Sequence, residues 1–300
     1  MSTKNAITGI VGQGAIGLLA ASQLALRQQP FHLLLRQPIH NSLVLNFRAQ
    51  QQDYPLLLNC QPPQLPISLL LVPVKAFSVQ SALRQWLPLC AADADIVLCH
   101  NGMGTLEMAM RQLQPGQKLW FASTTHGALK SGPHQLEHTG MGRTLLGPVN
   151  DVAKNSLAPV VLLNAALGPV ELVSDILPVL WQKLAINAVI NPLTALLMVK
   201  NGELTEPQYR AQIDQLVAEF CQVALTQGQQ FDVPSLTRDV LAVATKTAGN
   251  YSSMQQDRAL QRPDELEYIT GFLLAAAAKA GIGIPAHQQL YQQLRAVKPA

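Results

Sequence analysis

A glycine-rich segment near the start of the chain restricts the fold more than any other short feature. It reads GIVGQGAIGLLAASQL from Gly9 onward, so a GxGxxG pattern follows an apolar run typical of a buried strand and opens a run typical of a helix. In that context the first glycine permits a tight turn, the second lets the backbone approach a pyrophosphate, and the third allows close helix–strand packing. Backbone N–H groups at the helix start favour an anion. Unless the turn is purely structural, the segment predicts dinucleotide contacts at Gly12, Gln13, Gly14, Ala15, Ile16 and Gly17.

Short apolar runs alternate with turns and helical patterns through the first half of the chain. Continuous apolar runs of this length are typical of strands covered on both faces, as in a parallel sheet between helices. The predicted strands are 6–12, 31–36, 67–75, 95–100, 118–124 and 143–149, and the predicted helices are 15–28 and 78–87. This alternation predicts a doubly wound α/β fold, a Rossmann-like dinucleotide-binding domain over residues 1–174.

The second half changes to long helical periodicity. The predicted helices are 176–198, 206–227, 234–256, 264–280 and 285–297. Pro207 and Pro285 stand near helix starts, and Gly228 and Gly281 suit helix ends. We therefore expect an all-α domain over residues 175–300, and we expect the glutamine-rich tracts 50–52 and 227–230 to be loops or solvated surface.

Composition removes several classes of protein. The 300 residues are 48% hydrophobic, which is enough for two cores, and the formal net charge of +3 without a Lys/Arg cluster gives no indication of nucleic-acid binding. Four widely separated cysteines without a CxxC pair favour neither disulfides nor a zinc site, so we expect no metal. No apolar run reaches the roughly 20 residues of a membrane helix. With no secretory signal recognisable, we expect a cytoplasmic protein without membrane contacts.

The end of the second predicted strand indicates which dinucleotide binds. An NAD site usually has an acidic residue about 20 residues after the glycines, bonded to the ribose hydroxyls. Here LLLRQP ends the strand with Arg36, and the next acidic residue is Asp53. A guanidinium suits the 2′-phosphate of NADP(H). Arg36 therefore favours NADPH, the alternative being an ordinary surface arginine.

Two later strands deliver polar residues to their carboxyl ends, where ligands bind in open α/β sheets. LLLVPVKAF brings Lys75, and IVLCHNGMG brings Asn101 followed by two glycines. Asn101 could bridge cofactor ribose and substrate, or it could cap the following helix. His126 in ASTTHGA could be a base, although a structural role is the more usual one for a loop histidine.

The predicted helix 176–198 carries an unexpected polar stripe. Lys183, Asn187 and Asn191 recur every four residues among apolar neighbours and so share roughly one helical face. Pro192 removes a backbone donor and disfavours helix at Asn191. Packing gives no reason to place an ammonium and two carboxamides on one face of an apolar helix, so the stripe is a candidate site, and ligand sites favour a cleft between two domains.

A second interruption lies in NYSSMQQDRALQRPDELEYITGF, where Ser253 and Glu265 flank a predicted bend at Pro263. Taken alone, a serine or glutamate there is interpreted as a helix cap or as part of a solvated face.

The motifs together resemble the ketopantoate reductase (2-dehydropantoate 2-reductase) family. GxGxxG, VKAF, HNGMGTLE, KLAINAVINPLTAL, NGEL, SSMQQD and ELEYITGF occur in that family's order and spacing over essentially the whole chain. The KLxxNxxxNPLTA and SSMxQD segments are much more specific than the glycine motif. No motif position departs from the family pattern.

The resemblance implies a role for each of these residues. Lys183 would be the catalytic general acid, and Glu265 would hold the substrate hydroxyl and help position the lysine. Ser253 would bind the substrate carboxylate, Asn187 and Asn191 would line the same pocket, and Asn101 would link cofactor and substrate. NADPH would be bound by Gly12, Gly14, Gly17, Arg36 and Lys75. The partners would be ketopantoate or pantoate, in a monomer or homodimer.

The chemistry agrees with that assignment. Hydride delivery to a 2-oxo acid builds negative charge on the carbonyl oxygen, which a protonated lysine stabilises before donating its proton. One alternative is a paralogous NADPH-dependent reductase of another branched 2-oxo acid. Another is a non-catalytic NADP(H)-binding sensor, although a sensor would not need to keep Lys183, Asn187, Ser253 and Glu265.

Overall fold

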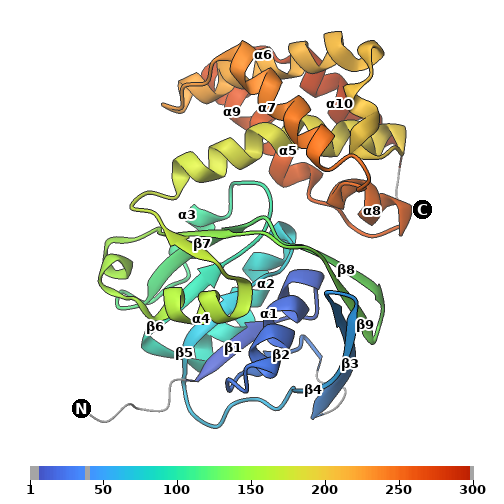
Figure 1. The fold of residues 1–300 in the computed structure, drawn as a ribbon. Helices are drawn as coiled ribbons and strands as arrows, with labels where there is room; N and C mark the ends of the chain where they lie inside the picture. The colour runs from blue at the N-terminus through green and yellow to red at the C-terminus, as the bar shows by residue number, and fades with distance from the viewer. Residues whose placement is uncertain (1–6, 38–40, 298–300) are drawn as a thin grey trace. The chain divides into compact units, whose positions relative to one another are not determined.

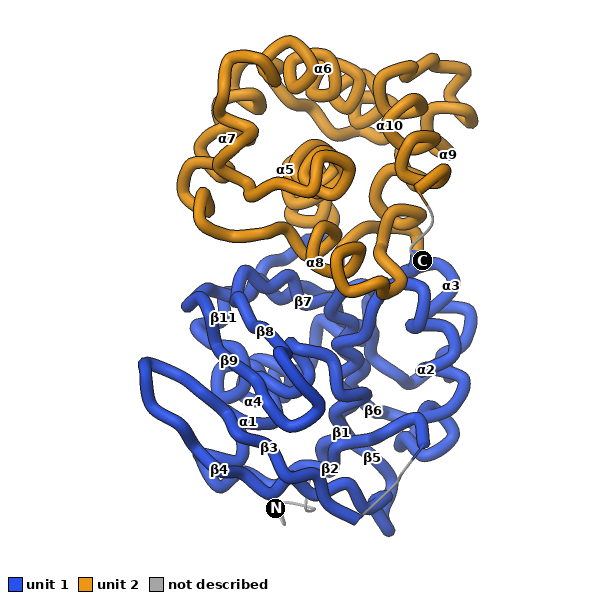
Figure 2. The backbone as a smooth tube through the Cα atoms, turned by 90° about the vertical axis from the view of Figure 1, so that its right-hand side faces the viewer, with its two compact units in different colours: residues 1–100, 105–176 blue, residues 101–104, 177–300 orange. Residues whose placement is uncertain are grey.

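The computed structural model describes residues 7–37 and 41–297. Contacts between Cα atoms divide the chain into two compact units, coloured separately in Figure 2. Unit 1 comprises residues 1–100 and 105–176, and unit 2 comprises residues 101–104 and 177–300. Residue 6, the first of the predicted strand 6–12, lies outside the described residues.

Unit 1 is built on a seven-stranded sheet with the order β11-β10-β7-β6-β5-β1-β2. Every neighbouring pair is parallel except β10 and β7. The strands are β1 (Thr8–Val11), β2 (His32–Leu34), β5 (Ile67–Val72), β6 (Cys90–Leu98), β7 (Lys118–Thr124), β10 (Thr144–Pro148) and β11 (Val170–Leu172). The six predicted strands are all present, and β11 is additional.

Helices cover both faces of this sheet, as the continuous apolar strands require. They are α1 (Ala15–Leu26), α2 (Val79–Trp86), α3 (Leu106–Met110) and α4 (Ala158–Leu167). Helix α1 packs on α4, whereas α2 packs on α3, and Figure 2 shows the two pairs on opposite sides of the strands. The predicted doubly wound α/β fold is confirmed. Helix α4 was not predicted.

A second sheet in unit 1 was not predicted. Its order is β4-β3-β9-β8, formed by the strands β3 (Ser42–Ala49), β4 (Gln52–Asn59), β8 (Gly127–Gly132) and β9 (Gln135–Gly140). The β3–β4 hairpin turns at Gln50 and Gln51, both with positive φ, and Gln52 begins β4. All three glutamines are exposed, as expected for the tract 50–52. Helix α1 packs against β4, β8 and β9 and links this sheet to the core of unit 1 (Figure 1).

Unit 2 is helical, as predicted. Its helices are α5 (Leu177–Leu197), α6 (Arg210–Thr226), α7 (Val233–Lys246), α8 (Ser253–Ala259), α9 (Phe272–Ala280) and α10 (Pro285–Ala296). The 3-10 turns η4 (Asn201–Thr205) and η5 (Pro207–Tyr209) precede α6, and the π-helical turn η6 (Glu267–Gly271) leads into α9. Helix α5 packs against α6, α7, α8 and α10 and is the centre of this core.

Two helix predictions in unit 2 are wrong in detail. The predicted helix 234–256 is two helices, α7 and α8, because Asn250 leaves the helix and its carbonyl oxygen accepts the N–H of Asn201 at 2.9 Å. The predicted helix 264–280 begins later, at Leu266, and its first turns are π-helical. Within the described residues, no helix is long and apolar enough to cross a membrane.

Candidate functional site

The glycine-rich turn after β1 has the geometry that its sequence predicts. Gly12 has φ +82°, and its N–H donates to the Leu34 carbonyl at 2.8 Å. A Cβ on Gly17 would lie 3.1 Å from Cγ of Pro73 and 3.3 Å from the Gly12 carbonyl oxygen, so a side chain there would push on Pro73 and on the turn where helix α1 approaches the strands. Gly14 is the N-cap of α1 and makes no side-chain cap bond, and the first turn holds no acidic residue. The helix start therefore fits an anionic group such as a pyrophosphate.

The neighbouring strands place two cations at the same edge of the sheet. Strand β1 pairs with β2 on one side and β5 on the other, so the strand order reverses beside the glycine turn, where open α/β sheets bind ligands. Arg36 lies just beyond β2 and is exposed, and its carbonyl oxygen accepts Nε2 of Gln85 at 3.3 Å. Lys75 lies just beyond β5, where its half-buried side chain stands at the start of the 3-10 turn η1 (Ala76–Ser78).

A third cation at the glycine turn was not predicted. Lys130 belongs to β8, and its Nζ donates to the carbonyl oxygen of Gln13 at 3.2 Å and lies 3.4 Å from Oε1 of the same residue. Residues 13 and 130 are 117 positions apart, and the strand that joins them was not predicted either. A basic residue in a small, glycine-rich tract was the only local signal.

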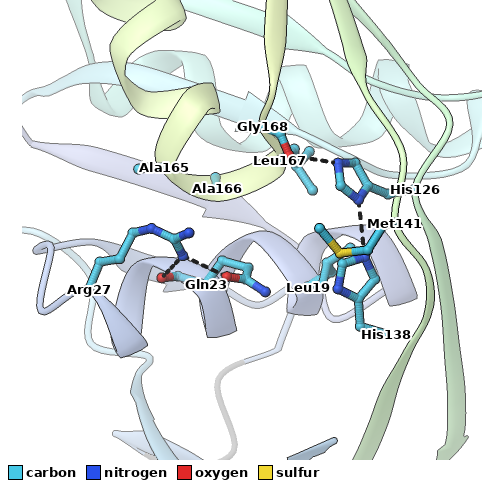
Figure 3. A pocket seen from close by; sticks show the side chains of 10 residues that line it. All are labelled: Leu19, Gln23, Arg27, His126, His138, Met141, Ala165, Ala166, Leu167 and Gly168. Carbon is cyan, nitrogen blue, oxygen red and sulfur yellow. Dashed lines mark hydrogen bonds between the residues drawn. The ribbon is translucent and has the colours of Figure 1, made fainter. Parts of the chain in front are cut away.

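His126 has a structural environment rather than that of an exposed base. Its Nε2 bonds the Gly168 carbonyl oxygen at 3.1 Å, and its Nδ1 lies 3.0 Å from Nε2 of His138 and 3.2 Å from the Gly142 nitrogen, as Figure 3 shows for the first two contacts. Burial lowers the pKa of His126, and burial together with the neighbouring His126 lowers the pKa of His138. The lowered pKa favours the neutral form of the His126 ring, which is held between β8, β9 and the end of α4.

The polar stripe lies on α5 as predicted. Lys183 and Asn187 are half-buried, and Asn191 is buried with 6% of its surface exposed. The helix continues through Pro192 to Leu197, in agreement with the predicted range 176–198, although a proline disfavours helix at the residue before it. The Thr194 hydroxyl lies 2.7 Å from the Ile190 carbonyl oxygen and bonds this backbone acceptor beside the proline.

Asn101 and Glu265 meet within unit 2, although 164 positions separate them in the chain. Nδ2 of Asn101 donates to Oε2 of Glu265 at 3.2 Å, and Glu265 is only 3% exposed. The N-cap of helix α3 is Thr105, so the alternative role of Asn101 as that helix's cap is wrong. The Met103 N–H donates to the Tyr268 carbonyl oxygen at 2.8 Å and holds the segment 101–104 on the π-helical turn η6.

Two adjacent serines at the start of α8 have different environments. Ser252 is buried and is the N-cap, and its Oγ accepts the N–H of Gln255 at 3.1 Å and lies 2.7 Å from the hydroxyl of Thr194. Ser253 is the first helical residue, and it is exposed. Ser252 therefore fastens α8 to α5, while Ser253 stays accessible for the carboxylate role implied for it.

A buried ion pair precedes Glu265 and was not anticipated. Nε of Arg258 lies 2.7 Å from Oδ2 of Asp264, with 9% and 8% of the two side chains exposed. Nη1 of Arg258 also donates to the carbonyl oxygens of Leu294 and Val297 at 2.9 and 3.0 Å. Oδ1 of Asp264 accepts the Leu266 N–H at 2.9 Å. The backbone on both sides of Glu265 is therefore fixed.

Comparison with known proteins gives the family. Residues 8–151 match the family described as Ketopantoate reductase PanE/ApbA, and residues 175–298 match the family described as its C terminal part. The 2-dehydropantoate 2-reductase of Vibrio cholerae is 33% identical over 296 residues, 96% of this chain and 97% of that protein. Its counterpart in Yersinia pestis is 35% identical over 291 residues, covering 95% and 93%.

Solved structures agree with the sequence relatives. The probable 2-dehydropantoate 2-reductase of Bacillus subtilis has a TM-score of 0.80 at 27% identity and covers 97% of this chain and 100% of its own. D-mandelate dehydrogenase, solved with NADH and anilino(oxo)acetate, has a TM-score of 0.85 at 23% identity and covers 97% of both chains, which shows a shared fold. The resemblance inferred from the motifs is confirmed, and the chain belongs to the ketopantoate reductase family of oxidoreductases.

Proposed function

We propose that this chain reduces 2-dehydropantoate (ketopantoate) to pantoate with NADPH, in the biosynthesis of pantothenate and coenzyme A. The observation that carries the proposal most directly is the bond between Asn101 and Glu265. Two residues from separate motifs share one partly buried contact, in the same unit as Lys183. The near full-length identity to 2-dehydropantoate 2-reductases supports the choice of substrate.

The cofactor side of the proposal rests on unit 1. A bound nicotinamide dinucleotide supplies the hydride. The residues proposed to hold it are the glycine turn from Gly12 to Gly17, Lys75 and Arg36, and Asn101 adds an amide. Arg36 is exposed at the end of β2, where a 2′-phosphate would be recognised. The D-mandelate dehydrogenase with a similar fold was solved with NADH, so the preference for NADPH rests on Arg36.

The chemical role proposed for unit 2 is that of acid and binding wall. As hydride adds to C2 of the 2-oxo acid, the electrons of the carbonyl double bond move to its oxygen, and the ammonium of Lys183 donates a proton there to give the 2-hydroxy acid. Asn187 and Asn191 supply neutral donors along the same helical face. Ser253, at the start of α8, would bind the carboxylate, and Glu265 would accept a hydrogen bond from the substrate hydroxyl.

Oxidation of NADPH in the presence of a panel of 2-oxo acids tests the function. We expect kcat/KM for ketopantoate to exceed that for other branched or aryl 2-oxo acids, including the 2-oxo acid of mandelate. Preferred turnover of another acid would replace this proposal by the paralogous reductase. Binding of NADPH without turnover of any 2-oxo acid would favour the alternative of a non-catalytic NADP(H)-binding sensor.

Arg36→Ala tests the cofactor choice. We expect KM for NADPH to rise about tenfold or more, because a charge-assisted contact to the 2′-phosphate is lost, with little change for NADH. An equal effect on both dinucleotides would remove the 2′-phosphate assignment.

A further inference from the structure

We propose that Lys130 binds the pyrophosphate of the dinucleotide at the glycine turn, and so adds a residue to the proposed cofactor site of the glycine turn, Lys75 and Arg36. The inference rests on the proposed cofactor and deepens it. Neither the glycine motif nor the strand ends of the main sheet point to this residue, because it comes from the second sheet of unit 1.

The second sheet brings Lys130 to the glycine turn. Strand β8 pairs with β9 and packs against α1, the helix that the glycine turn opens. The side chain of Lys130 then reaches the turn itself, with Nζ 3.2 Å from the Gln13 carbonyl oxygen and 3.4 Å from its Oε1. Gln13 is the residue between the first two glycines of GxGxxG, the point where the backbone approaches a pyrophosphate.

The electrostatics of the turn favour this use of the lysine. Helix α1 starts with a glycine N-cap that makes no side-chain cap bond, and its first turn has no acidic residue, so the positive end of the helix dipole is not neutralised there. An ammonium beside such a helix start adds a full positive charge where phosphate oxygens would bind. Lysine serves in this way as a point charge on phosphates.

Lys130 can also bind a phosphate oxygen while it keeps its bond to the glycine turn. The bond from Nζ to the Gln13 backbone is shorter than the contact to Oε1, so the contact to Oε1 is the one that a phosphate oxygen would replace. Exchange of the 3.4 Å contact for a phosphate oxygen keeps the backbone bond at 3.2 Å. The bond to Gln13 thereby holds the Lys130 ammonium at the glycine turn, where its positive charge would attract phosphate oxygens.

The position of Lys130 selects the pyrophosphate rather than the 2′-phosphate. The pyrophosphate lies at the start of the first helix, whereas the 2′-phosphate lies near the end of the second strand. Lys130 contacts Gln13 at the first place, and Arg36 follows β2 at the second. Lys130 should therefore act equally on NADPH and NADH, unlike Arg36.

The test compares Lys130→Met with a matched loss of charge in the same unit. Lys154→Met is the control, because Lys154 pairs with Asp151 at 2.7 Å, its side chain is 59% exposed, and it lies after β10. Binding of NADPH, NADH and adenosine 2′-monophosphate is measured by calorimetry without substrate. Lys130→Arg tests whether a cation alone restores binding, and thermal unfolding checks that each variant is folded.

We expect Lys130→Met to raise Kd for NADPH and NADH by the same factor, about tenfold, and to leave adenosine 2′-monophosphate unchanged. Lys130→Arg should recover most of the affinity, and Lys154→Met should match the wild type. If Lys130→Met binds both dinucleotides as the control does, or weakens NADPH and adenosine 2′-monophosphate but not NADH, the assignment is overturned. If the wild type binds neither dinucleotide, the proposed function falls as well. If the wild type binds both dinucleotides and Lys130→Met binds them equally tightly, only the assignment of Lys130 fails and the proposed function stands.

Discussion

Replacing Gly102 by alanine tests how the chain holds Asn101 against Glu265. Gly102 has φ +79°, and a Cβ there would lie 2.4 Å from the carbonyl oxygen of Tyr268 and 2.7 Å from its carbonyl carbon. Both are backbone atoms of the π-helical turn, so rotation of a side chain cannot relieve the collision. The same oxygen accepts the Met103 N–H at 2.8 Å, and any displacement would weaken that bond as well.

Gly104→Ala is the matched control, and the difference between the two variants isolates the collision. Gly104 has φ +96°, but a Cβ there would meet only Cδ2 of Phe272 at 3.4 Å, an ordinary contact. Both variants carry the cost of an L-residue at positive φ, about 1–2 kcal/mol. Gly102→Ala adds overpacking of about 1–3 kcal/mol. We expect the free energy of unfolding to fall by about 1–2 kcal/mol for Gly104→Ala and by about 2–5 kcal/mol for Gly102→Ala.

Urea denaturation gives the two free energies, and hydrogen exchange followed by mass spectrometry locates the loss. Exchange in Gly102→Ala should accelerate in peptides that contain Met103 or Tyr268 and stay unchanged in those from β1 and β5. KM for the 2-oxo acid should rise more than in Gly104→Ala, because Asn101 and Glu265 move apart. Equal stability and equal exchange in the two variants would refute the argument that Gly102 is required by its approach to Tyr268.

Three further predictions concern the proposed general acid, the buried ion pair and the two buried histidines. Lys183→Ala should lower kcat at least ~10²-fold and leave Kd for NADPH unchanged in calorimetry, since a general acid is lost and the dinucleotide site is not. Arg258→Met should lower the free energy of unfolding in urea by about 3–5 kcal/mol, because Asp264 then stays buried without its cation, and Arg258→Lys should lower it less. Burial lowers the pKa of His126 and His138, so below about pH 6.5 the unfolded chain binds protons that the folded chain does not. The melting temperature should therefore fall as the pH drops below about 6.5, and the fall should be smaller in His138→Gln.

The main sheet could be predicted because burial on both faces leaves a plain signal. Strands β5 and β7 are each buried at every position but one, and the predicted range of β7, 118–124, agrees with the structure. The second sheet is covered on one face only. In β3 the exposed positions alternate with Leu45 and Phe47, which are fully buried, whereas its neighbour β9 carries mostly polar or small residues. These strands therefore lack the continuous apolar run from which the strands of the main sheet were predicted.

The break between α7 and α8 does have a signal in the sequence. Ser252 and Gln255 form the S-x-x-Q spacing of a capping box, and the structure places Ser252 at the N-cap. Continuous helical periodicity through Val243 and Met254 hides the break. The loop is held by Asn250, whose partner Asn201 comes from the NGEL segment far earlier in the chain, and such a contact cannot be inferred from local pattern.

The residues of the site were easier to predict than the contacts between them. The stripe from Lys183 to Asn191 follows from helical periodicity alone, because packing gives no reason to place three polar residues on one face of an apolar helix. The bond between Asn101 and Glu265 could not be found in this way, since Asn is also a common cap. Lys130 has no motif at all, and only the unpredicted strand β8 brings it to Gln13.

Three of the proposed site residues in unit 2 share a further property that explains how they are held. Each is next in sequence to a residue that the fold fixes: Ser253 follows Ser252, which is bonded to α5; Glu265 follows Asp264, which is paired with Arg258; and Asn101 precedes Gly102, which lies against Tyr268. Support from the adjacent residue fixes the backbone at each of these three positions, so substitutions at these neighbours should change KM by displacing the proposed site residues.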